Sequence, residues 1–210
     1  MAKQPRPGYT KTRLVPPLTA LQAADLYEAM LLDIVDRLAD RADCDTAIAI
    51  DAVESAAWFT DATPGLPQVV QRGDALGDRL DAVLTQCLAL GYEAAVAISS
   101  DSPDLPAGHL GEALARLADD SNDIVLGPTE DGGYYLIGWK QAWTPVVAEV
   151  TMSTPDVLRD TLAIAERVGA RVGLAPTWFD VDDASDLARL RRDLDPAELP
   201  RLAAMLEGLS

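Results

Sequence analysis

Thiols and imidazoles are scarce in this chain of 210 residues, which contains two cysteines and one histidine. Cys44 and Cys87 lie far apart, with no CxxC motif or Cys/His cluster. This spacing argues against a zinc site or a disulfide framework and fits two reduced thiols in a cytoplasmic protein. With His109 as its sole histidine, the sequence shows no Ser/His/Asp or Cys/His constellation for nucleophilic catalysis.

Positive charge is also scarce, with 17 Lys and Arg against 34 Asp and Glu and a formal net charge of −17. Such a field repels phosphate backbones, so we expect no nucleic-acid partner. A small anionic ligand is still compatible with it, because a local basic cluster or a bound cation reverses the field inside a cleft. No apolar run approaches the roughly 20 residues of a membrane span, and the N-terminus has no apolar signal core. We therefore expect a cytoplasmic protein without a membrane span.

Helix-like and strand-like apolar patterns alternate along the chain. Helical spacing after Thr19, a candidate N-cap, predicts a long amphipathic helix over 20–41. Short apolar runs predict strands covered on both faces, and "GYYLIGW" predicts a strand that need not be parallel to its neighbours. The expected strands are 46–50, 67–70, 94–99, 123–127, 133–139 and 170–175, and the further helices are 76–90, 107–118, 155–168 and 184–193.

This alternation predicts one α/β domain over residues 1–210. We expect three layers, with helices on both faces of a mostly parallel mixed sheet. The last segment, "DPAELPRLAAMLEGL", predicts a terminal helix that packs either on the domain or on a second subunit, so a homodimer is one expectation.

Carboxylates follow two of the apolar runs. Asp101 ends "AAVAIS", and Asp182 lies in "WFDVDDASDL", while ligands of open α/β sheets bind beyond the carboxyl ends of the strands. Carboxylate oxygens suit Mg²⁺ or Mn²⁺, which prefer a few carboxylates together with water and substrate phosphates. The alternative for Asp101 is a turn that caps the next helix. Asp183 and Asp186 read as helix N-terminal charges, which makes Asp182 the better ligand candidate.

The N-terminal segment "KQPRPGYTKTR" is a basic island, since the first 24 residues contain no Asp or Glu. Its prolines and Gly8 shape a loop, and its cations, Lys3, Lys11 and Arg13 among them, could grip a phosphate chain. The alternative is a solvated basic terminus. The loop matches no Walker pattern.

Two glycine-containing segments complete the candidate site. "GPTEDGGYYLIG" places Asp131 before Gly132, Gly133 and Tyr134, which predicts an acceptor pocket that a ligand can approach closely. A tight hairpin with edge-strand tyrosines is the alternative. "QRGDALGDRL" offers Arg79 at a strand-to-helix junction, where an anion or a base edge can be held, although helix capping explains the same pattern.

Taken together, "KQPRPGYTKTRL", "LGDRL", "SSDSPDLP", "GPTEDGGYYLIG" and "FDVDDASDL" resemble a bacterial family of glycosyltransferases in the nucleotide-diphospho-sugar transferase superfamily. The resemblance spans nearly the whole chain and implies the GT-A fold, a Rossmann-like sandwich. Related small guanylyltransferases use similar basic loops and metal-binding aspartates. The resemblance implies that Asp101 and Asp182 bind the metal and that Lys11 and Arg13 bind phosphate.

The sequence departs from this family in three places. Met1 and Ala2 stand where the family's first strand should finish, so the first strand is missing. Either the gene start was assigned too late or the sheet lacks a central strand, and we predict the former. Met152 replaces a tryptophan, and the family's "DTPED" turn is replaced by residues 182–186 here. The match to the family's metal site is therefore weaker at Asp182 than at Asp101.

The leading hypothesis is a divalent-metal-dependent glycosyltransferase that moves a sugar from a nucleotide-diphospho-sugar donor to a small-molecule acceptor. Mg²⁺ or Mn²⁺ would neutralise the diphosphate leaving group, Lys11 and Arg13 would stabilise its charge, and Asp131 would deprotonate the acceptor if the reaction inverts. One alternative is nucleotidyl transfer from a nucleoside triphosphate with release of pyrophosphate. Another is a non-catalytic module that binds nucleotide sugars.

Overall fold

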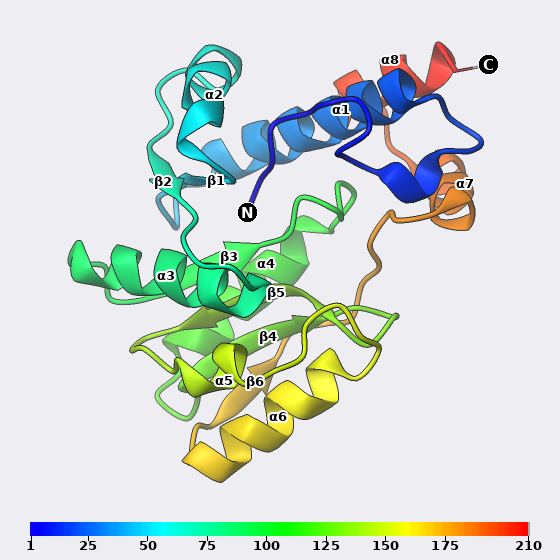
Figure 1. Cartoon of the computed structure of the whole chain (residues 1–210). Helices are drawn as coiled ribbons and strands as arrows, with labels where there is room; N and C mark the ends of the chain where they lie inside the picture. The colour runs from blue at the N-terminus through cyan, green and yellow to red at the C-terminus, as the bar shows by residue number, and fades with distance from the viewer. Residues whose placement is uncertain (210) are drawn as a thin grey trace. The chain divides into compact units, whose positions relative to one another are not determined.

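The structure, a computed structural model, describes residues 1–209, which divide into two compact units. The first unit comprises Met1–Val70, Ser100–Asp104 and the chain from Asp180 onward, and the second comprises Gln71–Ser99 and Leu105–Phe179. The chain therefore passes between the units several times, as the colours in Figure 1 show.

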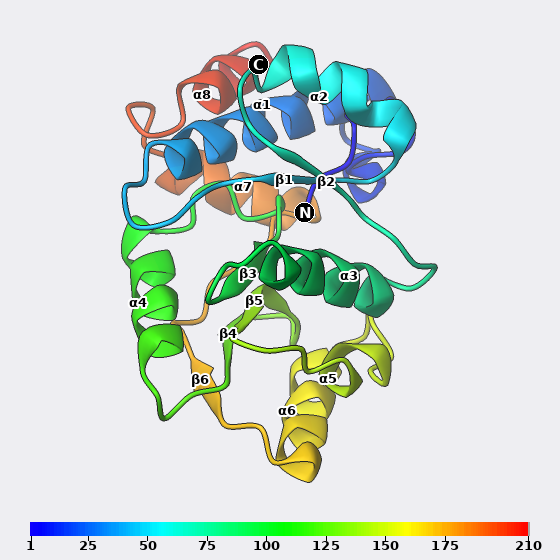
Figure 2. The ribbon, with the colours of Figure 1, turned by 90° about the vertical axis from the view of Figure 1, so that its left-hand side faces the viewer.

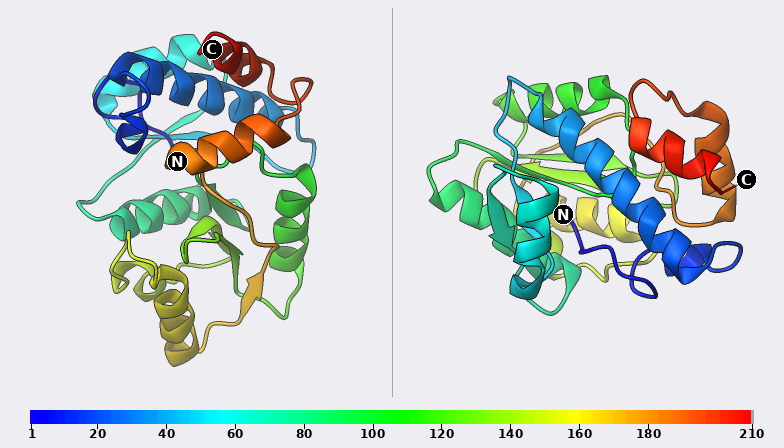
Figure 3. Two further views of the ribbon diagram at one scale, coloured as in Figure 1. Left: turned by 90° about the vertical axis from the view of Figure 1, so that its right-hand side faces the viewer. Right: turned by 90° about the horizontal axis from the view of Figure 1, so that it is seen from above.

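A long helix, α1 (Ala20–Ala39), organises the first unit. Thr19 caps it as expected, because its hydroxyl accepts from the Gln22 backbone N–H while the Gln22 side chain accepts from the Thr19 N–H. Around α1 lie short elements, seen from two sides in Figure 3. They are η1 (Thr12–Leu14), β1 (Ile48–Ile50), η2 (Val53–Ser55), α2 (Ala56–Ala62), β2 (Gln68–Val70), α7 (Ala184–Asp193) and α8 (Pro200–Glu207).

One face of α1 builds the apolar core against β1 and α2. Tyr27, Leu31 and Val35 of α1 cluster there with Ile50 and Phe59. β1 pairs in parallel with β2. On the N-terminal side, where the resemblance implies a first strand, Ala2 forms an isolated parallel bridge with Ile50.

The other side of α1 holds α8 through one buried carboxylate. Asp33 is 1% exposed and accepts hydrogen bonds from the backbone N–H of Leu202 at 2.9 Å and of Arg201 at 3.3 Å. The Arg201 guanidinium adds a contact of 3.2 Å. Since the first N–H groups of a helix lack intrahelical acceptors, Asp33 serves α8 as a cap supplied by another helix.

The second unit is a four-stranded mixed sheet covered by helices. Its strands follow the order β3 (Ala95–Ile98), β5 (Tyr134–Trp139), β4 (Ile124–Pro128) and β6 (Val172–Leu174). β5 runs antiparallel to both of its neighbours, and β4 and β6 are parallel. Helix α4 (Ala107–Ala118) covers one face, and α3 (Leu76–Ala89), α5 (Pro145–Ala148) and α6 (Val157–Val168) lie on the other (Figure 2).

The predicted α/β class with a mixed sheet is confirmed, and the predicted strands and long helices all form near their expected bounds. The sheet of the second unit has more antiparallel strand pairs than the mostly parallel sheet that was predicted, because β5 lies between β3 and β4 and runs antiparallel to both. Two short helices, α2 and α5, were not predicted. None of the described helices has the length and apolar character needed to cross a membrane. One domain over residues 1–210 stays a prediction.

An ion pair at the entry to β4 predicts how the second unit responds to acid. Arg171 donates from Nε and Nη2 to Asp123 at 2.8 Å each, and its backbone N–H adds a contact of 2.9 Å. The Arg171 side chain first, and its backbone N–H second, lower the pKa of Asp123 from 3.8 to about 2. Because the folded pKa lies below the unfolded value, the stabilisation is present above 3.8 and is lost as the pH falls through about 2.

We therefore expect Asp123→Asn to lower the free energy of unfolding at pH 7 by an amount on the order of 1 kcal/mol, since solvent screens the pair. We also expect the variant to lose less stability than the wild type as the pH is lowered. Urea unfolding of both proteins at several pH values measures this. Asp120→Asn is the matched control, since Asp120 lies in the same loop and its contact with Lys140 is long, at 3.9 Å. A variant at Asp123 with the acid profile of the wild type would contradict the prediction.

Candidate active site

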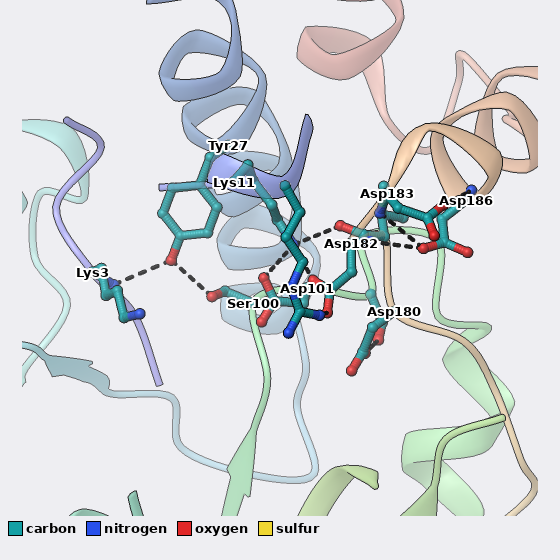
Figure 4. A network of polar contacts seen from close by, with 12 residues as sticks. Lys3, Lys11, Tyr27, Ser100, Asp101, Asp180, Asp182, Asp183 and Asp186 are labelled. Atoms are coloured by element: carbon teal, nitrogen blue, oxygen red, sulfur yellow. Dashed lines mark hydrogen bonds and ion pairs between the residues drawn. The ribbon is translucent and has the colours of Figure 1, made fainter. Parts of the chain in front are cut away.

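The Lys11 ammonium group lies between two carboxylates of the first unit. Its Nζ atom is 2.5 Å from Asp101 Oδ1 and 3.3 Å from Asp182 Oδ1, and it donates to the Val181 carbonyl oxygen at 2.7 Å. The Lys11 side chain is 4% exposed, whereas those of Asp101 and Asp182 are each 40% exposed. The two acids that the sequence placed at strand ends therefore turn toward one atom (Figure 4).

Backbone contacts hold the two carboxylates in this arrangement. The Val181 N–H donates to the Asp101 carbonyl oxygen at 2.8 Å, which ties the two segments together. Asp183 caps α7 by accepting from the Asp186 N–H at 3.1 Å, and Asp186 Oδ2 accepts from the Asp182 N–H at 3.0 Å. Asp183 and Asp186 thus form a capping box, in agreement with their interpretation as helix N-terminal charges.

Asp180 is a third carboxylate in this neighbourhood, and it was not among the predicted site residues. Ser102 Oγ donates to Asp180 Oδ1 at 2.5 Å. Burial, followed by the charges of Asp101 and Asp182, raises the pKa of Asp180 to about 6, while the Ser102 hydrogen bond opposes the shift. The apolar run that leads into Asp182 contains Asp180 as well, but its burial is a tertiary property.

Tyr27 connects the N-terminal loop with the segment that carries Asp101. Its hydroxyl accepts from the Lys3 backbone N–H at 3.1 Å and lies 2.8 Å from Ser100 Oγ (Figure 4). Burial is the largest cause that raises the pKa of Tyr27 to about 12. Within the sequence, Tyr27 is one apolar position of an amphipathic helix, so no local signal marked it.

The cations of the N-terminal basic island differ in their contacts and in their exposure. Arg13 is 75% exposed, and its Nη1 atom lies 3.3 Å from Asp182 Oδ2. The Lys3 side chain is exposed. Gly8 adopts a φ of 81°, a left-handed conformation that favours glycine, with open space where a Cβ would lie. Of the predicted phosphate binders, the structure brings Lys11 and Arg13 to the two carboxylates.

The predicted acceptor residues meet in the second unit, in the turn between β4 and β5. Asp131 Oδ1 accepts from Thr129 Oγ1 at 2.5 Å and from the Gly133 N–H at 3.1 Å. Gly132 has a φ of 91°, and a Cβ there would lie 2.0 Å from the Pro155 carbonyl oxygen. These contacts explain the segment as a tight turn, and an acceptor pocket there stays a prediction.

Two further predicted residues of the second unit have internal partners. The Tyr134 hydroxyl lies 3.8 Å from Met152 Sδ, and burial raises the pKa of Tyr134 to about 12. Arg79, in the first turn of α3, donates to the Asp74 carbonyl oxygen at 2.7 Å. The structure thus accounts for Arg79 by local contacts at the start of the helix.

The chemistry of Asp101 and Asp182 fits a small divalent ion. Among residues 1–209 no group of three or more His, Cys, Asp or Glu side chains is placed to hold a metal by itself. Mg²⁺ and Mn²⁺ do not need such a cage, because they are commonly bound by one or two carboxylates, several waters and substrate phosphates. Two partly exposed carboxylates that share one cationic neighbour satisfy this requirement.

Several solved structures resemble this chain. One from Desulfovibrio desulfuricans G20, described as a "putative nucleotide-diphospho-sugar transferase", is 30% identical, with a TM-score of 0.89 over 99% of this chain and 91% of that chain. CMP:2-keto-3-deoxy-manno-octonic acid synthetase complexed with CTP is 13% identical, with a TM-score of 0.55 over 78% and 86%. A third structure, 4-diphosphocytidyl-2C-methyl-D-erythritol synthase, is 16% identical, with a TM-score of 0.50 over 80% of this chain and 88% of that chain. The latter two show a shared fold.

A search of curated proteins gives no match. The sequence profile of a family described as "Uncharacterized protein conserved in bacteria (DUF2064)" matches residues 34–154. This segment is more than half of the chain and contains Asp101. The chain therefore belongs to the DUF2064 family and has the fold of the nucleotide-diphospho-sugar transferases.

Proposed function

We propose that the protein is a transferase that takes a sugar from a nucleotide-diphospho-sugar donor, with Mg²⁺ or Mn²⁺ held by Asp101 and Asp182. The observation that carries this proposal is the convergence of both carboxylates on Lys11 Nζ, at 2.5 and 3.3 Å. The description of the Desulfovibrio relative, similar over 99% of the chain, supports the same reaction class.

The residues of the first unit can neutralise and hydrogen-bond a diphosphate leaving group. The bound ion would neutralise negative charge on the diphosphate. Arg13, exposed and planar, can donate two parallel hydrogen bonds to phosphate oxygens, while Lys11 contributes a point charge. Gly8 and Lys3 belong to the same loop and are proposed as further donor contacts. The loop thereby stabilises the charge that develops as the glycosidic bond breaks.

Residues of the second unit are proposed to bind the acceptor. If the reaction inverts, the acceptor hydroxyl needs a base, for which Asp131 is the candidate. Gly132, Gly133, Tyr134 and Arg79 are proposed as substrate contacts. Asp131→Asn separates the two roles of this residue, because an asparagine Oδ1 still accepts from Thr129 and Gly133 while the basic carboxylate is gone.

Nucleotidyl transfer is the second candidate function. The two more distant structural neighbours support it, since one is a CMP:2-keto-3-deoxy-manno-octonic acid synthetase complexed with CTP and the other is a 4-diphosphocytidyl-2C-methyl-D-erythritol synthase. A triphosphate would use the same cations, and metal with positioning can carry phosphoryl chemistry without a protein base. In this reaction the released product is pyrophosphate.

An assay of released products decides between the candidates. The protein is incubated with Mn²⁺ and, in separate reactions, nucleotide-diphospho-sugars and nucleoside triphosphates, with small hydroxylated and phosphorylated acceptors. We expect free nucleoside diphosphate from a nucleotide sugar, including slow hydrolysis when water is the acceptor. Release of pyrophosphate alone would eliminate glycosyl transfer, and binding without turnover would indicate a non-catalytic module.

A further inference from the structure

We propose that Lys11 occupies the position of the divalent ion when no nucleotide is bound, and that the metal and the nucleotide displace it together. This inference rests on the proposed function, because it assigns Asp101 and Asp182 to the same ion. It adds a regulatory property: in the free protein, the lysine contacts both carboxylates and keeps the metal position closed.

The Lys11 ammonium group has no N–H donor left for a phosphate oxygen. A lysine ammonium has three N–H donors and no acceptor. The three partners of Lys11 Nζ are Asp101 Oδ1 at 2.5 Å, Val181 O at 2.7 Å and Asp182 Oδ1 at 3.3 Å. All three donors are used in this arrangement. Lys11 therefore binds a phosphate oxygen only after it leaves at least one of these partners.

Charge makes Lys11 and a divalent ion mutually exclusive at this position. Nζ contacts Oδ1 of Asp101 and Oδ1 of Asp182, and these are the two carboxylates proposed to hold the ion. Mg²⁺ takes its oxygen ligands at about 2.0–2.1 Å, so an ammonium on the same oxygens would lie against a double positive charge. Arg13 contacts the other oxygen of Asp182, Oδ2, and need not leave.

Two consequences follow for ligand binding. Metal alone binds weakly, because its apparent affinity is reduced by the fraction of molecules in which Lys11 holds the carboxylates. A nucleotide diphosphate gives the displaced ammonium a new anionic partner, so metal and nucleotide each increase the affinity for the other. The buried lysine therefore couples metal binding to the presence of a donor.

The test measures binding of Mn²⁺ alone, from the electron paramagnetic resonance signal of the free ion, without any turnover. The expected result is that Lys11→Met binds Mn²⁺ at least about tenfold more tightly than the wild type, because the competing ammonium is gone. The gain should disappear in the double variant Lys11→Met/Asp101→Asn. Lys140→Met removes the same charge from the second unit and should leave the affinity unchanged.

Lys11→Gln provides a second variant if Lys11→Met does not fold, since its amide still donates hydrogen bonds to the carboxylates. Should the Lys11 variants bind Mn²⁺ as weakly as the wild type, or more weakly, while Asp101→Asn abolishes binding, the displacement is refuted and the proposed function stands. Equal gains in Lys11→Met and Lys140→Met would refute it also, by showing a general charge effect. If neither the wild type nor the Lys11 variants bind Mn²⁺, the displacement and the metal-dependent function both fail.

Discussion

Asp101→Asn is expected to lower kcat/KM for the nucleotide-sugar donor by about 100-fold or more. The amide keeps the size of the side chain but removes the negative charge that would hold the metal. Without the metal, the negative charge that develops on the diphosphate is no longer neutralised. Asp101 also makes the shortest contact of the buried Lys11 ammonium, at 2.5 Å, so the variant should unfold at a lower temperature. The activity is therefore measured well below the unfolding midpoint of the variant.

Asp43→Asn is the matched control for this loss. It makes the same chemical change in the same unit, at an exposed ion pair with Arg41. Exposed pairs contribute little to stability, and we expect this variant to keep the activity of the wild type within about twofold. Full activity of Asp101→Asn, with unchanged dependence on Mn²⁺, would remove Asp101 from the proposed metal site.

Asp33→Ala is expected to destabilise the first unit by about 3 kcal/mol or more. The side chain of Asp33 is fully buried, and its removal leaves the N–H groups of Arg201 and Leu202 without their acceptor at the start of α8. Buried donors that lose a charged partner cost more than the average hydrogen bond contributes. Chemical denaturation followed by circular dichroism measures the change.

Asp36→Ala separates the buried cap from the ion pair beside it. Asp36 accepts from the same Arg201 guanidinium at 2.6 Å, but its side chain is 61% exposed. We expect a cost below about 1 kcal/mol for this substitution. Equal effects of the two substitutions would show that the guanidinium contact, and not the helix cap, stabilises α8 against α1.

Local patterns predicted most of the secondary structure. The helix after Thr19 is readable because its capping box and apolar spacing involve neighbours three or four residues apart. The seven-residue helix α2 escaped prediction, since so few turns show little periodicity and much of its stability comes from packing, as of Phe59 in the core.

The site was predictable in its residue types but not in its contacts. Carboxylates after apolar runs indicated Asp101 and Asp182, and the acid-free N-terminal segment indicated Lys11 and Arg13. Lys11 and Asp182 are 171 positions apart, and no spacing rule pairs them. Tyr27 and Asp180 were not chosen as site residues, because an apolar helix position and one aspartate among several acquire their roles from burial.

The approximate positions of the long helices and of the strands were readable from local patterns, because these elements depend on interactions between near neighbours in the chain. Three arrangements became visible only in the folded chain: β5 lies antiparallel between β3 and β4, Asp33 caps a helix 168 positions away, and Lys11 lies between two carboxylates. These arrangements depend on the path of the chain. Charge alone would attract Lys11 to any of the acids. The fold instead buries the Lys11 side chain and places its Nζ atom within 3.3 Å of Asp101 and Asp182.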